Sequence, residues 1–122
     1  MRKTIITIAL ALSSAAAFAV NTCDTMPTKN QRENCWSNLI GNYQAEADEY
    51  TFTVQESKKV PATVKRNVEK KRQAISKDAE ALCRKDSLGY PENTCYIEQI
   101  QKFKDFTYKE TSKYGVPDMR LN

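Results

Sequence analysis

The chain has 122 residues, 40% of them hydrophobic and 28% charged, which suffices for one small domain but not for two. Nineteen Lys and Arg against 15 Asp and Glu give a formal net charge of +4, and the chain has no histidine. The lack of histidine excludes imidazole catalysis and the commonest zinc ligand, and so small a net charge does not indicate a nucleic-acid partner. Only three glycines and four prolines disfavour a fold with many turns.

Residues 1–19 have the pattern of a cleavable signal peptide. Arg2 and Lys3 precede an apolar stretch over 5–19, which ends in the cleavage pattern Ala17-Phe18-Ala19. Because this stretch is shorter than the roughly 20 residues that span a bilayer, we expect no transmembrane segment in the mature form. The mature chain would begin at Val20 with a net charge of +2. The pattern predicts an exported bacterial protein, either periplasmic or secreted.

A first helix is predicted over 27–56. Pro27 stands where a first helical turn begins, a place at which its missing N–H group costs nothing. Apolar side chains then recur at steps of three and four, as on one face of a helix. These candidate core residues are Trp36, Leu39, Ile40, Tyr43, Ala47, Tyr50 and Val54. The connector Ser57-Lys58-Lys59-Val60 follows.

A second helix is predicted from Pro61 to a connector at Ser87-Leu88-Gly89-Tyr90, and a third from Pro91 to Gly115. Both repeat the helical spacing. The candidate core residues are Val64, Val68, Ile75, Ala79 and Leu82 in the second helix, with Tyr96, Ile100, Phe103, Phe106 or Thr107, and Tyr114 in the third.

Long helices joined by short connectors pack as antiparallel neighbours. The sequence therefore predicts an all-α fold after the signal peptide, a three-helix up-down-up bundle stapled by two disulfides. We expect this domain to extend over 20–115 and to be followed by a polar C-terminal tail at 116–122.

The four cysteines are predicted to form structural disulfides, because an exported protein meets an oxidising compartment and the chain has no Cys-x-x-Cys motif. Cys35 and Cys83 lie equally far from Lys59 in the first connector, so straight antiparallel helices would place them side by side. Cys23 and Cys95 would meet at the same end of the bundle. We therefore favour Cys35–Cys83 with Cys23–Cys95, and Cys23–Cys35 with Cys83–Cys95 stays as the alternative.

No catalytic constellation is present in the sequence. No serine can be paired with a histidine, no glycine-rich loop could cradle a phosphate, and the cysteine spacing is too wide for the known zinc modules. Glu46, Asp48 and Glu49 cluster on the first helix, but they fit a solvated helix face better than an acid–base pair. We expect no enzyme activity, no metal site and no cofactor.

Two surface features favour a protein-binding role. The second helix and its flanks are strongly basic, which suits either complementarity to the acidic first helix or docking of an anionic partner. The prominent cations are Lys58, Lys59, Lys65, Arg66, Lys70, Lys71 and Arg72. Tyrosine gives rigid amphipathic contact area, and Tyr90 and Tyr108 are the best candidate anchors outside the core stripe.

The chain resembles the LprI-type lysozyme-inhibitor family of small secreted bacterial domains. The similarity extends from Cys23 to about Lys109 and includes an early pair of cysteines about a dozen residues apart. Its most specific parts are the segment 71–83, Lys-Arg-Gln-Ala-Ile-Ser-Lys-Asp-Ala-Glu-Ala-Leu-Cys, and Cys95-Tyr96-Ile97-Glu98 after a loop that contains Gly-Tyr.

This resemblance implies binding to a lysozyme or another cell-wall hydrolase and inhibition of that enzyme. We would place the contact on the acidic face formed by Glu46, Asp48 and Glu49. Two other functions stay open: a periplasmic immunity protein against a delivered toxin, and a small envelope chaperone or scaffold. The oligomeric state does not follow from the sequence.

Overall fold

A computed structural model describes residues 22–120, so the signal peptide predicted at 1–19 lies outside the described residues. The chain divides into two compact units, one ending at Asn38 and the other extending from Leu39 to the C-terminus. Helix α2, Lys29–Glu56, contributes to both. The second unit also contains α3 (Ala62–Gln73), α4 (Ile75–Leu82), α5 (Asn93–Thr111) and the 3-10 helix η1 (Ser112–Tyr114).

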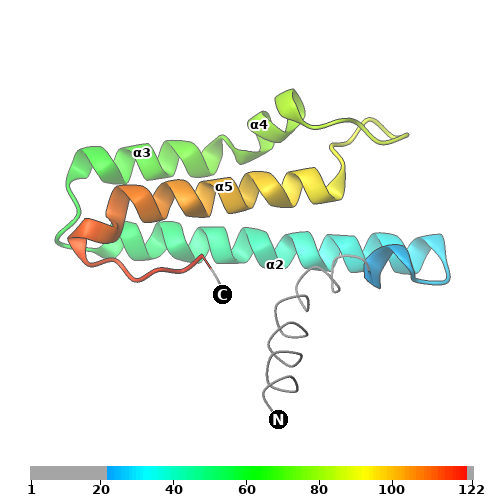
Figure 1. Ribbon diagram of the computed structural model, residues 1–122, viewed down its shortest axis with the longest axis horizontal. Coiled ribbons are helices and arrows are strands. Elements are labelled where there is room, and N and C mark those ends of the chain that lie inside the picture. Colours follow the sequence, from blue (N-terminus) through cyan, green and yellow to red (C-terminus); the bar gives the residue numbers. More distant parts are fainter. Residues whose placement is uncertain (1–21, 121–122) are drawn as a thin grey trace, which may run out of the picture. The chain divides into compact units, whose positions relative to one another are not determined.

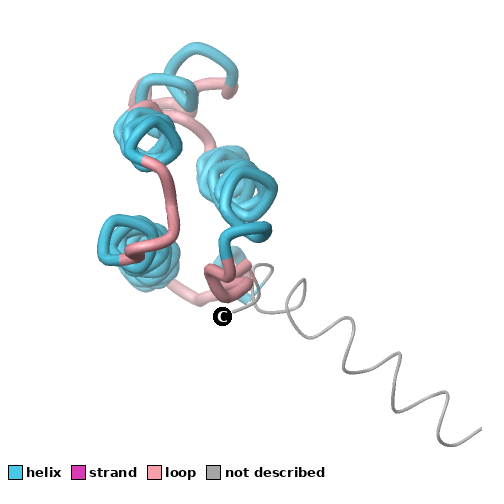
Figure 2. The backbone as a smooth tube through the Cα atoms, turned by 90° about the vertical axis from the view of Figure 1, so that its left-hand side faces the viewer, coloured by secondary structure: helices cyan, strands magenta, loops and turns pink. Residues whose placement is uncertain are grey.

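The prediction of an all-α bundle with two disulfides is confirmed. In the second unit, α2, α3 and α5 run side by side with alternating directions, and the end-on view agrees (Figures 1 and 2). The predicted second helix is interrupted at Ala74 and forms α3 and α4. No proline or glycine explains this break, because residues 73–75 are Gln, Ala and Ile.

Local sequence signals explain where the helices begin and end. Thr28 and Gln31 form a reciprocal capping box, since the hydroxyl of Thr28 accepts the Gln31 N–H at 3.1 Å and the Gln31 side chain accepts the Thr28 N–H at 3.2 Å. Pro61 immediately precedes α3. Gly115 has a φ of +81° and ends η1 in the left-handed conformation that glycine adopts without strain.

Most of the hydrophobic core of the second unit comes from the predicted stripes, and Val60 and Val116 join it from the predicted connector and tail. Its fully or almost fully buried members include Ala47, Tyr50, Val54, Val60, Val68, Ile75, Ile100, Phe103 and Val116. Threonine also enters this core, because the hydroxyls of Thr107 and Thr111 donate to the carbonyl oxygens four residues earlier. Thr107 is therefore buried, and Phe106 packs at the margin.

Two predictions about burial differ from the structure. Leu82 was expected in the core, but its side chain is 68% exposed, because it is the last residue of α4 and that end of α4 rises away from α5 (Figure 1). The sequence predicts a polar tail at 116–122, of which the structure describes residues 116–120. Val116 instead joins the core and Met119 packs against it.

Candidate functional site

The loop between α4 and α5 is closed at its base by a disulfide. Cys83 directly follows α4 and Cys95 lies in the first turn of α5, with 5.8 Å between their Cα atoms. The other disulfide joins Cys23 and Cys35 in the first unit, with a Cα–Cα distance of 5.4 Å. The favoured pairing, Cys35–Cys83 with Cys23–Cys95, is therefore wrong, and the alternative pairing is the one present.

Chain reversal within each Cys-x11-Cys segment explains this correction. Between Cys83 and Cys95 the backbone doubles back, and Lys85 and Pro91 face each other in an isolated antiparallel bridge. The turn after Cys23 is closed by the N–H of Met26, which donates to the Cys23 carbonyl at 3.4 Å. Because each segment turns back on itself, its two cysteines come close together. The pairing predicted from the sequence requires instead that straight helices extend through all four cysteines.

Asp86 organises the tip of the loop. Its Oδ1 accepts the N–H groups of Leu88 at 2.9 Å and Tyr90 at 3.0 Å. Its own N–H donates to the Tyr90 carbonyl at 2.7 Å, and its carbonyl accepts the N–H of Gly89 at 3.1 Å. Gly89 has a φ of +84°, a backbone conformation that residues with a Cβ atom disfavour. These hydrogen bonds close the tip into a compact turn, and the disulfide joins the two ends of the loop.

This ordered loop exposes large apolar side chains. Leu88 is 67% and Tyr90 65% exposed at the tip, and Leu82 is 68% exposed where α4 meets the loop. They are three of the four exposed large hydrophobic residues in 22–120, and the fourth is Phe52. Figure 1 shows the loop extending beyond the first turn of α5. We call Leu82, Leu88 and Tyr90 the apolar loop surface.

The charges around the apolar loop surface largely cancel. Arg84 pairs with Glu92 at 3.7 Å across the loop, and Lys85 pairs with Glu80 of α4. The Arg84 side chain is 91% exposed, so its ion pair contributes little to stability. Apolar contact area, rather than charge, therefore distinguishes this surface.

The predicted acidic contact residues have different surroundings. Glu46 forms an ion pair with Lys104 of α5, and Asp48 pairs with Arg72 of α3 at 2.7 Å. Both carboxylates thus hold α2 against its neighbours in the second unit. Glu49 is exposed and forms no ion pair within residues 22–120. The structure consequently does not bring the three side chains together as one free acidic patch.

The two candidate tyrosine anchors also differ. Tyr90 belongs to the apolar loop surface, whereas Tyr108 is half-buried beneath the guanidinium of Arg120, 3.8 Å from its ring centre. Asp118 holds that guanidinium at 2.7 Å. The hydrogen bond from Arg120 lowers the pKa of Asp118 below its ordinary value. Tyr108 is therefore partly covered by the chain's own C-terminal segment.

Of the three residues of the apolar loop surface, only Tyr90 is predicted from the sequence as a contact residue. Leu82 fitted the core stripe of its helix, and Leu88 was treated only as part of a connector. The sequence does contain a signal for Leu88. Large apolar residues are uncommon in a turn, so Leu88 and Tyr90 on either side of Gly89 indicate an exposed apolar surface.

The first unit is built around its own disulfide. Cys23 and Trp36 are buried there, and the indole N–H of Trp36 donates to Asp24 at 2.8 Å. Arg32 donates to the carbonyl of Met26 at 2.9 Å and holds the preceding turn. These contacts account for the order of residues 22–38 and leave Trp36 with little exposed surface.

Comparison with known protein families, curated proteins and solved structures finds no match to the chain. The resemblance to the lysozyme-inhibitor family therefore stays a prediction. Among the helices of residues 22–120, none has the length and apolar character needed to cross a membrane.

Proposed function

We propose that the chain is an exported protein-binding domain that inhibits a lysozyme-type cell-wall hydrolase through its apolar loop surface. The exposure of Leu88 and Tyr90 on an ordered, disulfide-closed loop is the observation that supports binding. The identity of the partner rests on the sequence resemblance to the inhibitor family, which extends from Cys23 to about Lys109 and is most specific at 71–83 and 95–98.

The geometry suits insertion into a concave site. A hydrolase that cleaves a polysaccharide holds its substrate in a cleft, and the loop between Cys83 and Cys95 offers a convex counterpart. Binding by an ordered loop loses little conformational entropy, because the hydrogen bonds to Asp86 already define the tip. Tyr90 offers an aromatic anchor and Leu88 an aliphatic one beside it.

The test is a cell-wall clearing assay with chicken-type lysozyme and the purified, oxidised protein. We expect saturable inhibition by the natural sequence and a loss of about 30-fold or more in affinity for Leu88→Ala/Tyr90→Ala, because interface anchors typically contribute 2 kcal/mol or more. Phe52→Ala is the matched control, since Phe52 is 64% exposed but lies on α2. Equal inhibition by all three proteins would exclude the loop as the binding site.

An envelope chaperone is the second candidate, because exposed Leu82, Leu88 and Tyr90 would also contact unfolded clients. A chaperone would bind several unrelated clients weakly and without fixed stoichiometry. Isothermal titration against folded lysozyme and against a reduced, unfolded client separates the two functions. One-to-one binding to the folded enzyme alone supports the inhibitor.

A further inference from the structure

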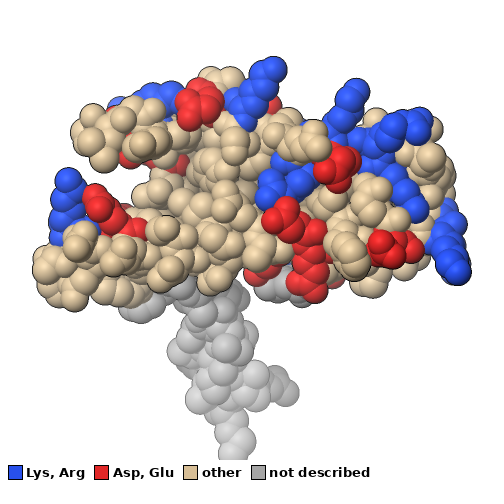
Figure 3. All heavy atoms as spheres, turned by 180° about the vertical axis from the view of Figure 1, so that it is seen from behind, with Lys and Arg blue, Asp and Glu red and all other residues tan. Residues whose placement is uncertain are grey.

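A row of cations follows the solvent side of α3 and α4. Arg66 and Lys70 are exposed one turn apart on α3, opposite the buried Val68. Lys77 is exposed on α4, opposite the buried Ile75, so the row continues on the next helix after the break at Ala74. In the view from behind, blue side chains project along the upper edge of the second unit, where α3 and α4 lie (Figure 3).

The cation row is extended by the turn before α3, where Lys58 and Lys59 are exposed. Within residues 22–120, none of these five cations forms an ion pair. Other basic side chains of α3 are engaged instead. Lys71 pairs with Asp78 at 3.6 Å, and Arg72 pairs with Asp48.

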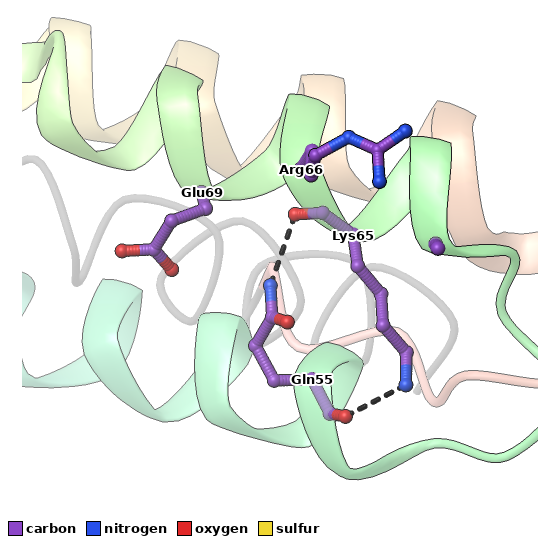
Figure 4. Close-up of a pocket in the computed structure, with 5 residues that line it drawn as sticks. Gln55, Lys65, Arg66 and Glu69 are labelled. Carbon is purple, nitrogen blue, oxygen red and sulfur yellow. Dashed lines mark hydrogen bonds between the residues drawn. The ribbon is translucent and has the colours of Figure 1, made fainter.

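The neighbouring carboxylates offset only part of the charge of the cation row and, in the described part of the chain, form no ion pair with it. Glu69 accepts a hydrogen bond from Gln73 at 3.2 Å, and its carboxylate is directed toward the side of α2 (Figure 4). Arg66 extends away from that seam, whereas Lys65 turns back and donates to the Gln55 carbonyl at 2.8 Å (Figure 4). An exposed carboxylate, Glu56, lies just before Lys58 and offsets part of the charge of the turn.

We propose that the cation row, Lys58, Lys59, Arg66, Lys70 and Lys77, holds the protein on a membrane surface that contains anionic phospholipids. Beside these cations, the exposed surface of α3 bears the neutral polar residues Thr63 and Gln73 and no large apolar side chain. The contact is therefore electrostatic and does not involve insertion into the membrane. This contact leaves the loop between Cys83 and Cys95 available for another partner.

The spacing of the cations favours lipid head groups over a stiff linear polyanion. Along α3, Arg66 and Lys70 are about 6 Å apart, whereas Lys77 lies on α4 beyond the break at Ala74, so the cations are not evenly spaced. A linear polymer with regularly spaced charges meets only part of such an uneven row. Anionic lipids diffuse laterally and gather beneath each cation whatever its spacing, and each contributes independently.

The experiment measures co-sedimentation of the mature protein, which the sequence predicts to begin at Val20, with sucrose-loaded vesicles. One set is phosphatidylcholine alone, and the other contains about one third phosphatidylglycerol at low ionic strength. We expect binding to the anionic vesicles alone and its loss in about 1 M salt, where the screening length falls to about 3 Å. For Arg66→Gln/Lys70→Gln/Lys77→Gln we expect the partition coefficient to fall by about 100-fold.

The matched control is Lys102→Gln/Lys109→Gln/Lys113→Gln, which removes the same charge from exposed positions of α5 and η1. A change of less than about threefold in this control shows that the position of the cations matters rather than the net charge. Equal losses in both triple variants, or no binding of the natural sequence to anionic vesicles, would overturn the proposal. Binding of soluble polyphosphate without vesicle binding would also overturn it, in favour of a polymeric partner.

Discussion

The ammonium group of Lys104 on α5 forms an ion pair with the carboxylate of Glu46 on α2, and the Lys104 side chain is only 2% exposed. The ring of Tyr43 lies 5.7 Å from the same ammonium group. Glu46 keeps 27% of its side-chain exposure, so the pair lies at the margin of the core. A carboxylate that the sequence marks as a candidate docking residue thus compensates a buried charge.

Glu46→Gln should destabilise the domain by about 3 kcal/mol, because it leaves the Lys104 charge buried without its counterion. Urea unfolding followed by circular dichroism measures the change. The double variant Glu46→Leu/Lys104→Met should recover most of that loss, since it removes both charges and keeps the volume. Glu49→Gln, a change at an exposed position, serves as the control and should alter stability by less than about 0.5 kcal/mol. Additive effects of the Glu46 and Lys104 substitutions would contradict the pairing.

Asp86→Ala should loosen the tip of the loop and leave the bundle intact. The substitution removes the oxygen that accepts the N–H groups of Leu88 and Tyr90, so these two amides should exchange with solvent at least tenfold faster. Hydrogen-exchange NMR measures this effect without any partner. The amides of buried residues such as Val68 and Phe103 report on the bundle and should keep their protection. Unchanged exchange at both tip amides would show that the disulfide alone orders the loop.

Removal of either disulfide should cost about 3 kcal/mol and lower the melting temperature by roughly 10 to 20 °C, because each bridge closes a short segment of the unfolded chain. The two bridges should differ in their effect on binding. Cys83→Ser/Cys95→Ser opens the loop that carries Leu88 and Tyr90, whereas Cys23→Ser/Cys35→Ser does not. Calorimetry measures the loss of stability, and the clearing assay measures the loss of inhibition.

Peptide mapping without reductant checks the disulfide pairing itself, and a Cys35–Cys83 peptide would contradict the pairing in the structure.

Tyr50→Phe should reduce the sensitivity of the domain to alkaline pH. The Tyr50 side chain is fully buried, and burial raises the pKa of this tyrosine above its ordinary value of 10.0. A raised pKa means that the stabilisation is complete below about pH 10, the pKa in the unfolded chain, and is lost as pH rises through the folded pKa. Urea midpoints between about pH 8 and 11 should therefore fall less in Tyr50→Phe than in the natural sequence. Parallel declines would show that other groups govern alkaline unfolding.

The periodicity of the sequence predicted most of the core but not how each helix ends. Tyr50, Val68 and Phe103 lie on stripes that any amphipathic helix must bury, so local spacing sufficed to find them. Leu82 fits the same spacing and is nevertheless exposed, because burial also requires another element over that turn. Val116 follows a helix-ending glycine and is nevertheless buried, because the chain turns back onto the core.

The sequence by itself determined that residues 22–120 form a mainly helical domain, that α2, α3 and α5 begin close to their prolines, and that the four cysteines pair, because these properties depend on neighbours close in the chain. It did not predict that α4 begins as a separate helix at Ile75. Only the tertiary structure decided which cysteines pair and which carboxylates are free. The approach of Lys104 to Glu46 depends on how distant segments pack, and the pairing of the cysteines depends on the chain reversals after Cys23 and Cys83, which bring the ends of each segment together. Helical spacing carries no record of such contacts, because many arrangements of the same helices satisfy the same stripes.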